Sequence, residues 1–217
     1  MSMGIRDWRS ATADWILLAD NRLLFTVYWS LFPDHFSLVP NPHISRYNRP
    51  MHSSTPVTKA LDVLEVEYVL HLHENTVRSL EQAARERNLS PSQIIRSLLF
   101  SLTHNSYVML LVPGPDQISW QKLRRHLDVS RVTMATPEQV KDVTGYEPGA
   151  VSPYGLPRPL RILVDQRILE HEIVSVGAGI RNAGIILKRK DLLRSLEIEI
   201  GDWGVKTGDW RLVTGNW

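Results

Sequence analysis

The stretch TPEQVKDVTGYEPGAVSPYGLPRPLRILVD, residues 136–165, combines three kinds of local structure. It begins with threonine and proline, a pair typical of an N-cap and a first helical position, so a short helix is predicted. It ends in LRILVD, an apolar run typical of a buried strand. Between them, residues 144–159 hold three glycines and four prolines. Glycine lets a ligand approach main-chain N–H groups and proline fixes their direction, so this segment is either a surface connection or a binding loop.

Helices and strands alternate on both sides of this stretch, from Thr55 onward. Predicted helices cover 55–65, 74–88, 119–127, 136–145 and 189–196, with a short helical turn at 90–93. Predicted strands cover 66–72, 94–102, 106–112, 131–135, 160–166, 171–177 and 183–188. Most of the apolar strands are continuous rather than alternating, which indicates a sheet covered on both faces. The sequence therefore predicts a single α/β domain with a mixed β-sheet flanked by helices.

Composition narrows the classes of function. The chain has 217 residues, 43% of them hydrophobic, and a formal net charge of +2, with a sequence pI of about 9.0. This charge permits a nucleic-acid partner without requiring one. The chain contains no cysteine, which excludes disulfides, thiolate metal sites and an enzyme-borne thiol nucleophile. The lack of cysteine is typical of a reducing cytoplasm, where we expect the protein to be located.

Three segments are expected along the chain. Residues 1–50 are either an extension outside the functional domain or a packed N-terminal arm, and residues 51–197 form the domain itself. Residues 198–217 repeat Gly-Asp/Asn-Trp every seven residues, which indicates a terminal strand or an aromatic surface patch. The most apolar run, 15–32, is interrupted by charged residues, so no membrane-spanning helix is predicted.

Three other features of the sequence contain residue types found in known kinds of site. SVGAGIRNAG (175–184) follows a strand, but its spacing does not match a dinucleotide fingerprint, and a tight glycine turn that lines a pocket remains open. His71 and His73 share one face of a strand, yet no further ligands cluster nearby, so no metal site is predicted. Ser152 lacks an evident base and orienting acid, which favours a backbone-binding role over a nucleophile.

The order of the segments resembles the YbaK family. The matching segments are TPVTKALDVLEVEY (55–68), QIIRSLLF (93–100), the opening stretch, and EIVSVGAGIRNAGIILKRKDLL (172–193). The family comprises prolyl-tRNA-editing proteins related to the editing domain inserted in bacterial prolyl-tRNA synthetases. The resemblance spans roughly residues 54–196. Its most specific element is Gly-x-x-x-Pro, met by Gly149 and Pro153.

The resemblance implies a mixed sheet that curves around a small pocket, and hydrolysis of the ester that joins a wrong amino acid to tRNA. Expected substrates are of the Cys-tRNA(Pro) or Ala-tRNA(Pro) type, and expected partners are the aminoacylated tRNA end and prolyl-tRNA synthetase. No cofactor, metal or membrane is implied. The loop from Gly149 to Pro153 would cup the ester with backbone groups. A nucleophile could come from the substrate, through the terminal ribose hydroxyl or a cysteine substrate's own thiol.

The resemblance also indicates the candidate site residues, and this chain departs from the family's pattern at one of them. The family usually has a lysine where this chain has Arg96, and arginine keeps the charge but cannot act as a base. That departure keeps a non-catalytic tRNA-binding or aminoacyl-binding module open as an alternative, and a structural salt bridge is a further reading of Arg96. The candidate catalytic residues are Arg96, Gly149 and Pro153, and the candidate substrate-binding residues are Ser152, Gly155, Asp165, Gly177 and Gly179. Asp165 is equally well explained as the cap of the helical turn that follows it.

Overall fold

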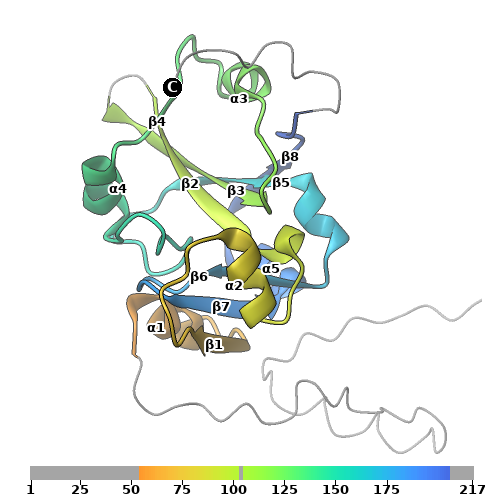
Figure 1. Ribbon diagram of the computed structural model, residues 1–217. Coiled ribbons are helices and arrows are strands. Elements are labelled where there is room, and N and C mark those ends of the chain that lie inside the picture. The colour runs from red at the N-terminus through yellow and green to blue at the C-terminus, as the bar shows by residue number, and fades with distance from the viewer. Residues whose placement is uncertain (1–53, 103–104, 206–217) are drawn as a thin grey trace, which may run out of the picture. The chain divides into compact units, whose positions relative to one another are not determined.

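The computed structural model describes residues 54–102 and 105–205. Its helices are α1 (Pro56–Val63), α2 (Leu80–Glu86), α3 (Trp120–Leu127), α4 (Pro137–Thr144) and α5 (Arg189–Ser195), with 3-10 turns η1 (Pro91–Gln93) and η3 (Gln166–Glu170). Its strands are β1 (Tyr68–Leu72), β2 (Ile95–Ser101), β3 (Tyr107–Pro113), β4 (Thr133–Met134), β5 (Arg161–Asp165), β6 (Ile173–Gly177), β7 (Ala183–Lys188) and β8 (Ile198–Gly201). Figure 1 shows their arrangement.

Capping side chains define where the helices begin, as the sequence predicts. At α1, the hydroxyl of Thr55 accepts the N–H of Thr58 at 3.1 Å. At α4, Thr136 accepts the N–H of Gln139 at 3.3 Å, and a proline follows the cap in both helices. These bonds satisfy N–H groups that a helix leaves without an internal partner. The glycine- and proline-rich loop begins at the other end of α4, where Gly145 is the C-cap with a φ of +75°.

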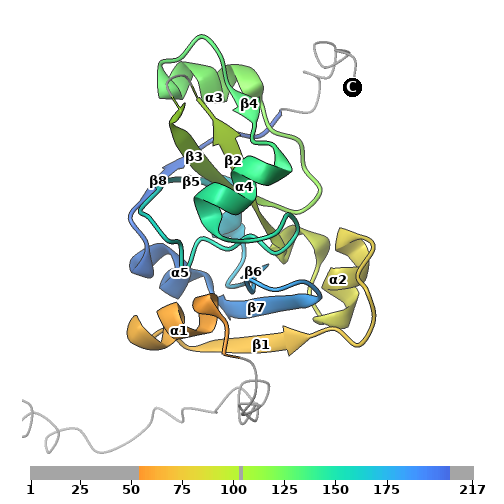
Figure 2. The same ribbon diagram turned by 90° about the vertical axis from the view of Figure 1, so that its left-hand side faces the viewer.

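The strands form two sheets. One is antiparallel in the order β1-β7-β6, and the other is mixed in the order β4-β2-β3-β5-β8, with β3, β5 and β8 parallel to one another. An isolated bridge between Ile94 and Ser175 links the two sheets. Figure 2 shows the β1-β7 pair below the β2-β3 pair. The mixed α/β fold predicted from the sequence is therefore confirmed, with the strands divided between two sheets.

Two apolar clusters cover the two faces of the larger sheet. The first lies between the sheets and includes Met109, Leu111, Val164, Val176 and Ile185. The second lies under α3 and includes Phe100, Leu110, Val112, Leu123 and Trp203. Residues of β3 alternate between these clusters, because successive side chains of a strand point to opposite faces. The continuous apolar pattern of β3 is thus explained by burial on both sides.

The folded unit continues beyond residue 197, where we placed the domain boundary. The next element, β8, pairs in parallel with β5. Trp203 is 4% exposed, and its indole N–H donates to the carbonyl of Val164 at 3.3 Å. Residues 198–205 therefore complete a sheet edge and a core. The rest of the tail and the predicted extension 1–50 lie outside the described residues. No helix in the described part is long and apolar enough to cross a membrane.

Candidate functional site

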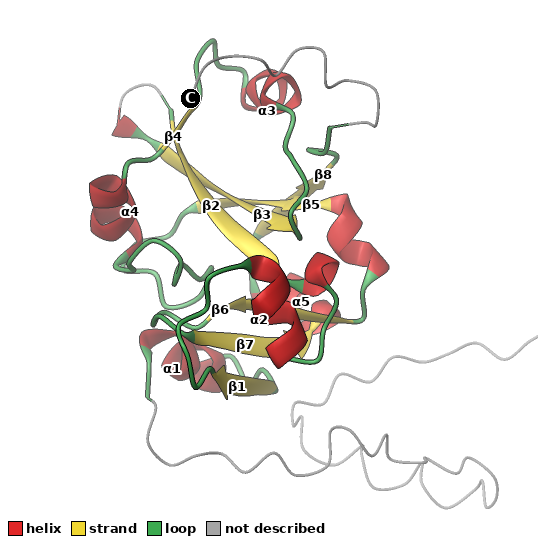
Figure 3. Cartoon of the chain, in the orientation of Figure 1, coloured by secondary structure: helices red, strands yellow, loops and turns green. Residues whose placement is uncertain are grey.

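The connection between α4 and β5 has no regular secondary structure, as Figure 3 shows. Its two ends are held together by the buried phenol of Tyr146, which donates to the carbonyls of Tyr154 at 2.6 Å and Gly155 at 3.0 Å. Gly155 has a φ of +66°, and a Cβ there would lie 2.6 Å from the carbonyl oxygen of Pro56. Gly155 is therefore required for close packing of the loop against the start of α1.

The segment from Gly149 to Pro153 passes from the surface into the protein. Gly149 is exposed, has a φ of +88°, and would place a Cβ in open space. Ala150, Ser152 and Pro153 are buried. Gly149 is therefore the one exposed residue of this segment, and a residue with a side chain there would be strained by its φ alone.

Main-chain N–H groups of this segment lack partners. The N–H of Ala150 donates to the carbonyl of Glu147 at 2.9 Å, but those of Gly149, Val151 and Ser152 donate to no described residue. Ser152 is fully buried, and its hydroxyl accepts the N–H of Tyr154 at 3.4 Å. Of the three residues, Ser152 is fully buried, Val151 is partly buried and Gly149 is exposed, and buried N–H groups without an acceptor are rare in native proteins. This segment can therefore donate to an oxygen atom of a ligand.

Two of the predicted substrate-binding residues, Gly177 and Gly179, lie directly against the Gly149–Pro153 loop. A Cβ at Gly177 would overlap the carbonyl oxygen of Val151, so the loop backbone lies on the bare strand. The N–H of Gly179 donates to the carbonyl of Ala150 at 3.0 Å, and a Cβ at Gly179 would lie 2.8 Å from the ring of Tyr146. The glycine turn and the Gly149–Pro153 loop are thus in direct contact, and their shared role as a site stays a prediction.

Arg96 and Asp165 lie together in a different cluster. Arg96 donates to the backbone oxygen of Asp116, whose carboxylate accepts from Arg167 at 2.6 Å. Arg167 also makes a forked pair with Asp165, at 2.8 and 2.9 Å. Asp165 accepts the N–H of Arg167 at 3.0 Å, so it caps η3, which was one of its two predicted roles. No hydrogen bond or ion pair in the described chain joins Arg96 to the Gly149–Pro153 loop.

The Arg96 side chain is only partly satisfied. Its Nε and the hydroxyl of the neighbouring Ser97 are buried without a partner among the described residues. Burial lowers the pKa of the Arg96 guanidinium, while nearby Asp116 opposes this shift. Because successive residues of a strand point to opposite faces, these two atoms lie on different sides of β2 and do not form one binding place.

Sequence reasoning missed Arg87, which lies on the same sheet face as the loop. From the C-cap of α2, its guanidinium donates to the hydroxyl of Ser175 at 2.9 Å and to Nε2 of His73 at 3.1 and 3.2 Å. It covers Gly184, where a Cβ would overlap it. Burial lowers the pKa of Arg87 to about 10. No linear pattern signals this arrangement, because the contacts with Ser175 and Ala183 join residues 88 and 96 positions apart.

A family model described as the aminoacyl-tRNA editing domain matches residues 74–195. This range includes the whole loop, the glycine turn and Arg87. The chain belongs to the aminoacyl-tRNA editing domain family. The resemblance to the prolyl-tRNA-editing proteins is therefore confirmed at the level of the family.

Curated relatives of this editing domain are much longer proteins. Proline--tRNA ligase of Bacillus licheniformis is 29% identical over 122 residues, which is 56% of this chain and 21% of the ligase. Proline--tRNA ligase of Streptococcus thermophilus is 32% identical over 125 residues, or 58% of this chain and 20% of the ligase. The chain thus spans about a fifth of the curated relatives it matches.

Solved structures share the fold of this editing domain. One, proposed to be a trans-editing enzyme for prolyl tRNA synthetase, has a TM-score of 0.64 and 25% identity, and covers 69% of this chain and 95% of its own. A hypothetical protein with a TM-score of 0.65 and 21% identity covers 70% of this chain and all of its own. The second likeness shows the fold alone.

The editing domain also places three potential metal ligands together. Ligand atoms of His71, His73 and Glu86 lie within 4.8 Å of one another. However, Arg87 donates to Nε2 of His73, so the Nδ1 proton of His73 is directed at Glu86. Both nitrogens of His73 are thereby engaged, and a guanidinium adjoins the cluster. The cluster is therefore better suited to hold the Arg87 side chain in position than to bind a metal cation.

Proposed function

We propose that this chain is a trans-acting aminoacyl-tRNA deacylase, which hydrolyses the ester of mischarged tRNA. The observation that carries the proposal is the set of N–H groups at Gly149, Val151 and Ser152 that have no acceptor within residues 54–102 and 105–205, in a loop that packs against the glycine turn. Membership of the aminoacyl-tRNA editing domain family supplies the substrate class. A similar solved structure, described as a trans-editing enzyme for prolyl tRNA synthetase, supports action on a tRNA charged by another protein.

The proposed mechanism uses backbone donors and the substrate itself. The N–H groups of Val151 and Ser152 hold the ester carbonyl oxygen, and they stabilise the negative charge that develops when water adds to the carbonyl carbon. One well-placed donor of this kind contributes about 3 kcal/mol, or roughly 100-fold in rate. The C–O bond to the ribose then breaks, the ribose oxygen takes a proton, and a free amino acid leaves. The adjacent ribose hydroxyl, or the thiol of a cysteine substrate, assists the water.

We propose substrates of the Cys-tRNA(Pro) or Ala-tRNA(Pro) type, and prolyl-tRNA synthetase as the source of the mischarged tRNA. Two findings support this choice. The matching curated relatives are proline--tRNA ligases, and one similar structure is described as acting for prolyl tRNA synthetase.

A non-catalytic binding module with the same fold is the alternative. The observation that favours it is the engagement of Arg96 with the backbone of Asp116, away from the loop. In that case the loop would hold an aminoacyl group without releasing it.

The test is hydrolysis of labelled alanyl-, cysteinyl- and seryl-tRNA(Pro) by the wild type and Gly149→Ala. The variant places a methyl group in front of the loop and strains a φ of +88°. We expect the release rate to fall about 100-fold, because the donors lose their alignment. Gly145→Ala is the matched control, since Gly145 also has a positive φ (+75°) but serves as the C-cap of α4.

Release by the wild type and by Gly145→Ala, with loss in Gly149→Ala, supports the deacylase. Tight binding of mischarged tRNA without release by the wild type would favour the binding module instead.

A further inference from the structure

Gly177 and Gly184 form a bare strip across β6 and β7. They are directly paired in the antiparallel ladder, so their missing side chains would lie on the same face of the sheet. The carbonyl of Val151 occupies the space over Gly177, and the guanidinium of Arg87 occupies the space over Gly184. Side chains of directly opposed residues start about 5 Å apart. Arg87 therefore lies roughly one strand spacing from the loop that holds the proposed ester site.

The Arg87 guanidinium is fixed in place but not neutralised. Its Nε donates one hydrogen bond to His73, Nη2 donates to His73 and to the carbonyl of Ala183 at 3.3 Å, and Nη1 donates to Ser175. Arginine has five N–H groups, so one hydrogen on Nη1 has no acceptor among the described residues. No described carboxylate contacts the guanidinium, since Glu86 reaches it only through His73.

The Arg87 guanidinium can therefore bind an anionic ligand. Burying a charge without a directly paired counter-ion is unfavourable. Glu86 favours the charged form of Arg87 but does not contact it, so a ligand anion in direct contact would lower the remaining cost. Arg87 is only partly covered, so a ligand can reach it. In the proposed reaction the ester sits on the terminal ribose of tRNA, and the nearest anion is the phosphate on the other side of that ribose. Arginine binds phosphate through a fork of N–H donors.

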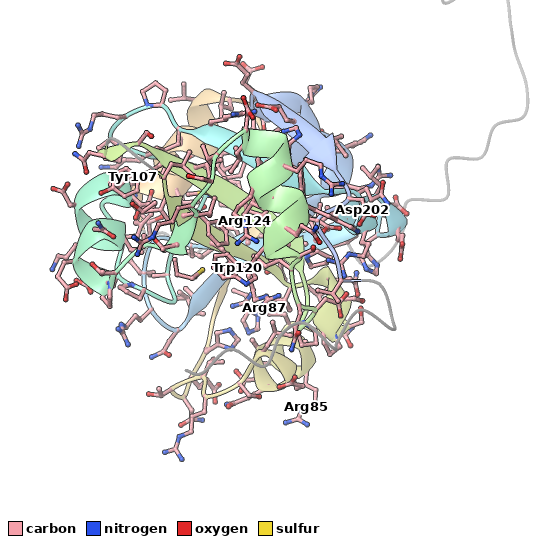
Figure 4. All side chains as sticks on the ribbon, turned by 90° about the horizontal axis from the view of Figure 1, so that it is seen from above. Arg85, Arg87, Tyr107, Trp120, Arg124 and Asp202 are labelled. Atoms are coloured by element: carbon pink, nitrogen blue, oxygen red, sulfur yellow. The ribbon has the colours of Figure 1, made fainter. Side chains whose placement is uncertain are left out.

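We propose that Arg87 is a substrate-binding residue that holds the phosphate of the 3′-terminal nucleotide, with His73 and Ser175 as positioning residues. This rests on the proposed function, because it places the terminal ribose between Arg87 and the Gly149–Pro153 loop. Arg85 provides the matched control. It lies on the same helix, is exposed, and its side chain makes no hydrogen bond or ion pair with the described residues; Figure 4 shows it at the outer edge, with Arg87 further inward.

The first experiment compares Arg87→Gln, Arg87→Lys and Arg85→Gln on two substrates, mischarged tRNA and a phosphate-free 3′-O-aminoacyl adenosine. Arg87→Gln should raise KM for the tRNA by about 10- to 100-fold, because a hydrogen bond to a charged group is lost. Its kcat, and its hydrolysis of the adenosine ester, should stay within about twofold of the wild type. Arg87→Lys, which keeps the charge, should fall in between, and Arg85→Gln should match the wild type.

The second experiment measures binding alone and needs no hydrolysis. We expect 5′-AMP to bind the wild type more tightly than adenosine does at equal ionic strength, and binding of uncharged tRNA to lose about one unit of salt slope in Arg87→Gln. Equal affinity for AMP and adenosine, or an equal slowing of both ester substrates by Arg87→Gln, would overturn the phosphate assignment. The latter result would place Arg87 at the ester carbonyl. If the wild type hydrolyses neither ester, the deacylase proposal fails, while the AMP comparison still decides the role of Arg87.

Discussion

Glycine has two observed uses at this candidate site, and a third is proposed. Gly155 permits close packing on Pro56, and Gly177 leaves room for the carbonyl of Val151. Gly149 alone faces open space, where its positive φ directs the loop inward. The sequence indicates that glycines matter in this loop, but it cannot separate packing from ligand approach, because that depends on which atoms lie opposite each Cα.

The effect of His71 on the pH dependence of stability tests the charge environment around Arg87. Burial lowers the pKa of His71 below its usual 6.5, and His73 and Arg87 lower it further, while Glu86 opposes them. The folded state therefore binds fewer protons than the unfolded state just below pH 6.5, so stability should be lost as the pH falls through 6.5 toward the folded pKa. We expect His71→Gln to lose less stability than the wild type between pH 7.5 and 5.5 in urea denaturation. Equal losses in both proteins would contradict this environment.

At the scale of elements, α2 departs most from its prediction. The pattern of 74–88 predicts one amphipathic helix, but α2 begins at Leu80 after the Ser79 cap. Tertiary contacts hold the preceding segment out of the helix. The N–H of Val77 donates to the side chain of Asn182 at 3.2 Å, and the N–H of His73 donates to the carbonyl of Asn182 at 2.8 Å. A periodic pattern cannot report such contacts with a turn more than 100 residues away.

The strand β8 and Trp203 carry a stability prediction at the same scale. Trp203 is buried under α3 and donates to Val164. Trp203→Ala should lower the free energy of unfolding by about 3–5 kcal/mol, because it leaves a large cavity. Ile200→Ala on the same strand, where the side chain is 49% exposed, should cost less than about 1 kcal/mol. Chemical denaturation of both variants measures the difference. A small effect of Trp203→Ala would mean that the domain ends near residue 197.

At the scale of the whole molecule, the sequence predicts the Gly149–Pro153 loop better than it predicts the residues around that loop. Helix caps, the glycine turn and the Gly149–Pro153 segment are local signals, and the structure brings the last two together. Arg87 could not be found, because its position depends on the pairing of β6 with β7 and on the packing of α2. Arg96 is the opposite case. The resemblance picks it out as a candidate site residue, but in the structure its side chain donates to the backbone of Asp116.

The central claim is that a main-chain N–H in this loop stabilises the developing oxyanion. Replacing the amide between Val151 and Ser152 by an ester, through incorporation of the α-hydroxy analogue of serine, removes that N–H and keeps the side chain. The matched control is the same replacement at Ala150, whose N–H donates to Glu147. We predict that the Ser152 ester lowers single-turnover hydrolysis of mischarged tRNA about 100-fold with little loss of stability. The Ala150 ester should instead cost about 1 kcal/mol of stability and keep most of the hydrolysis rate. Hydrolysis at the wild-type rate by the Ser152 ester would contradict the claim.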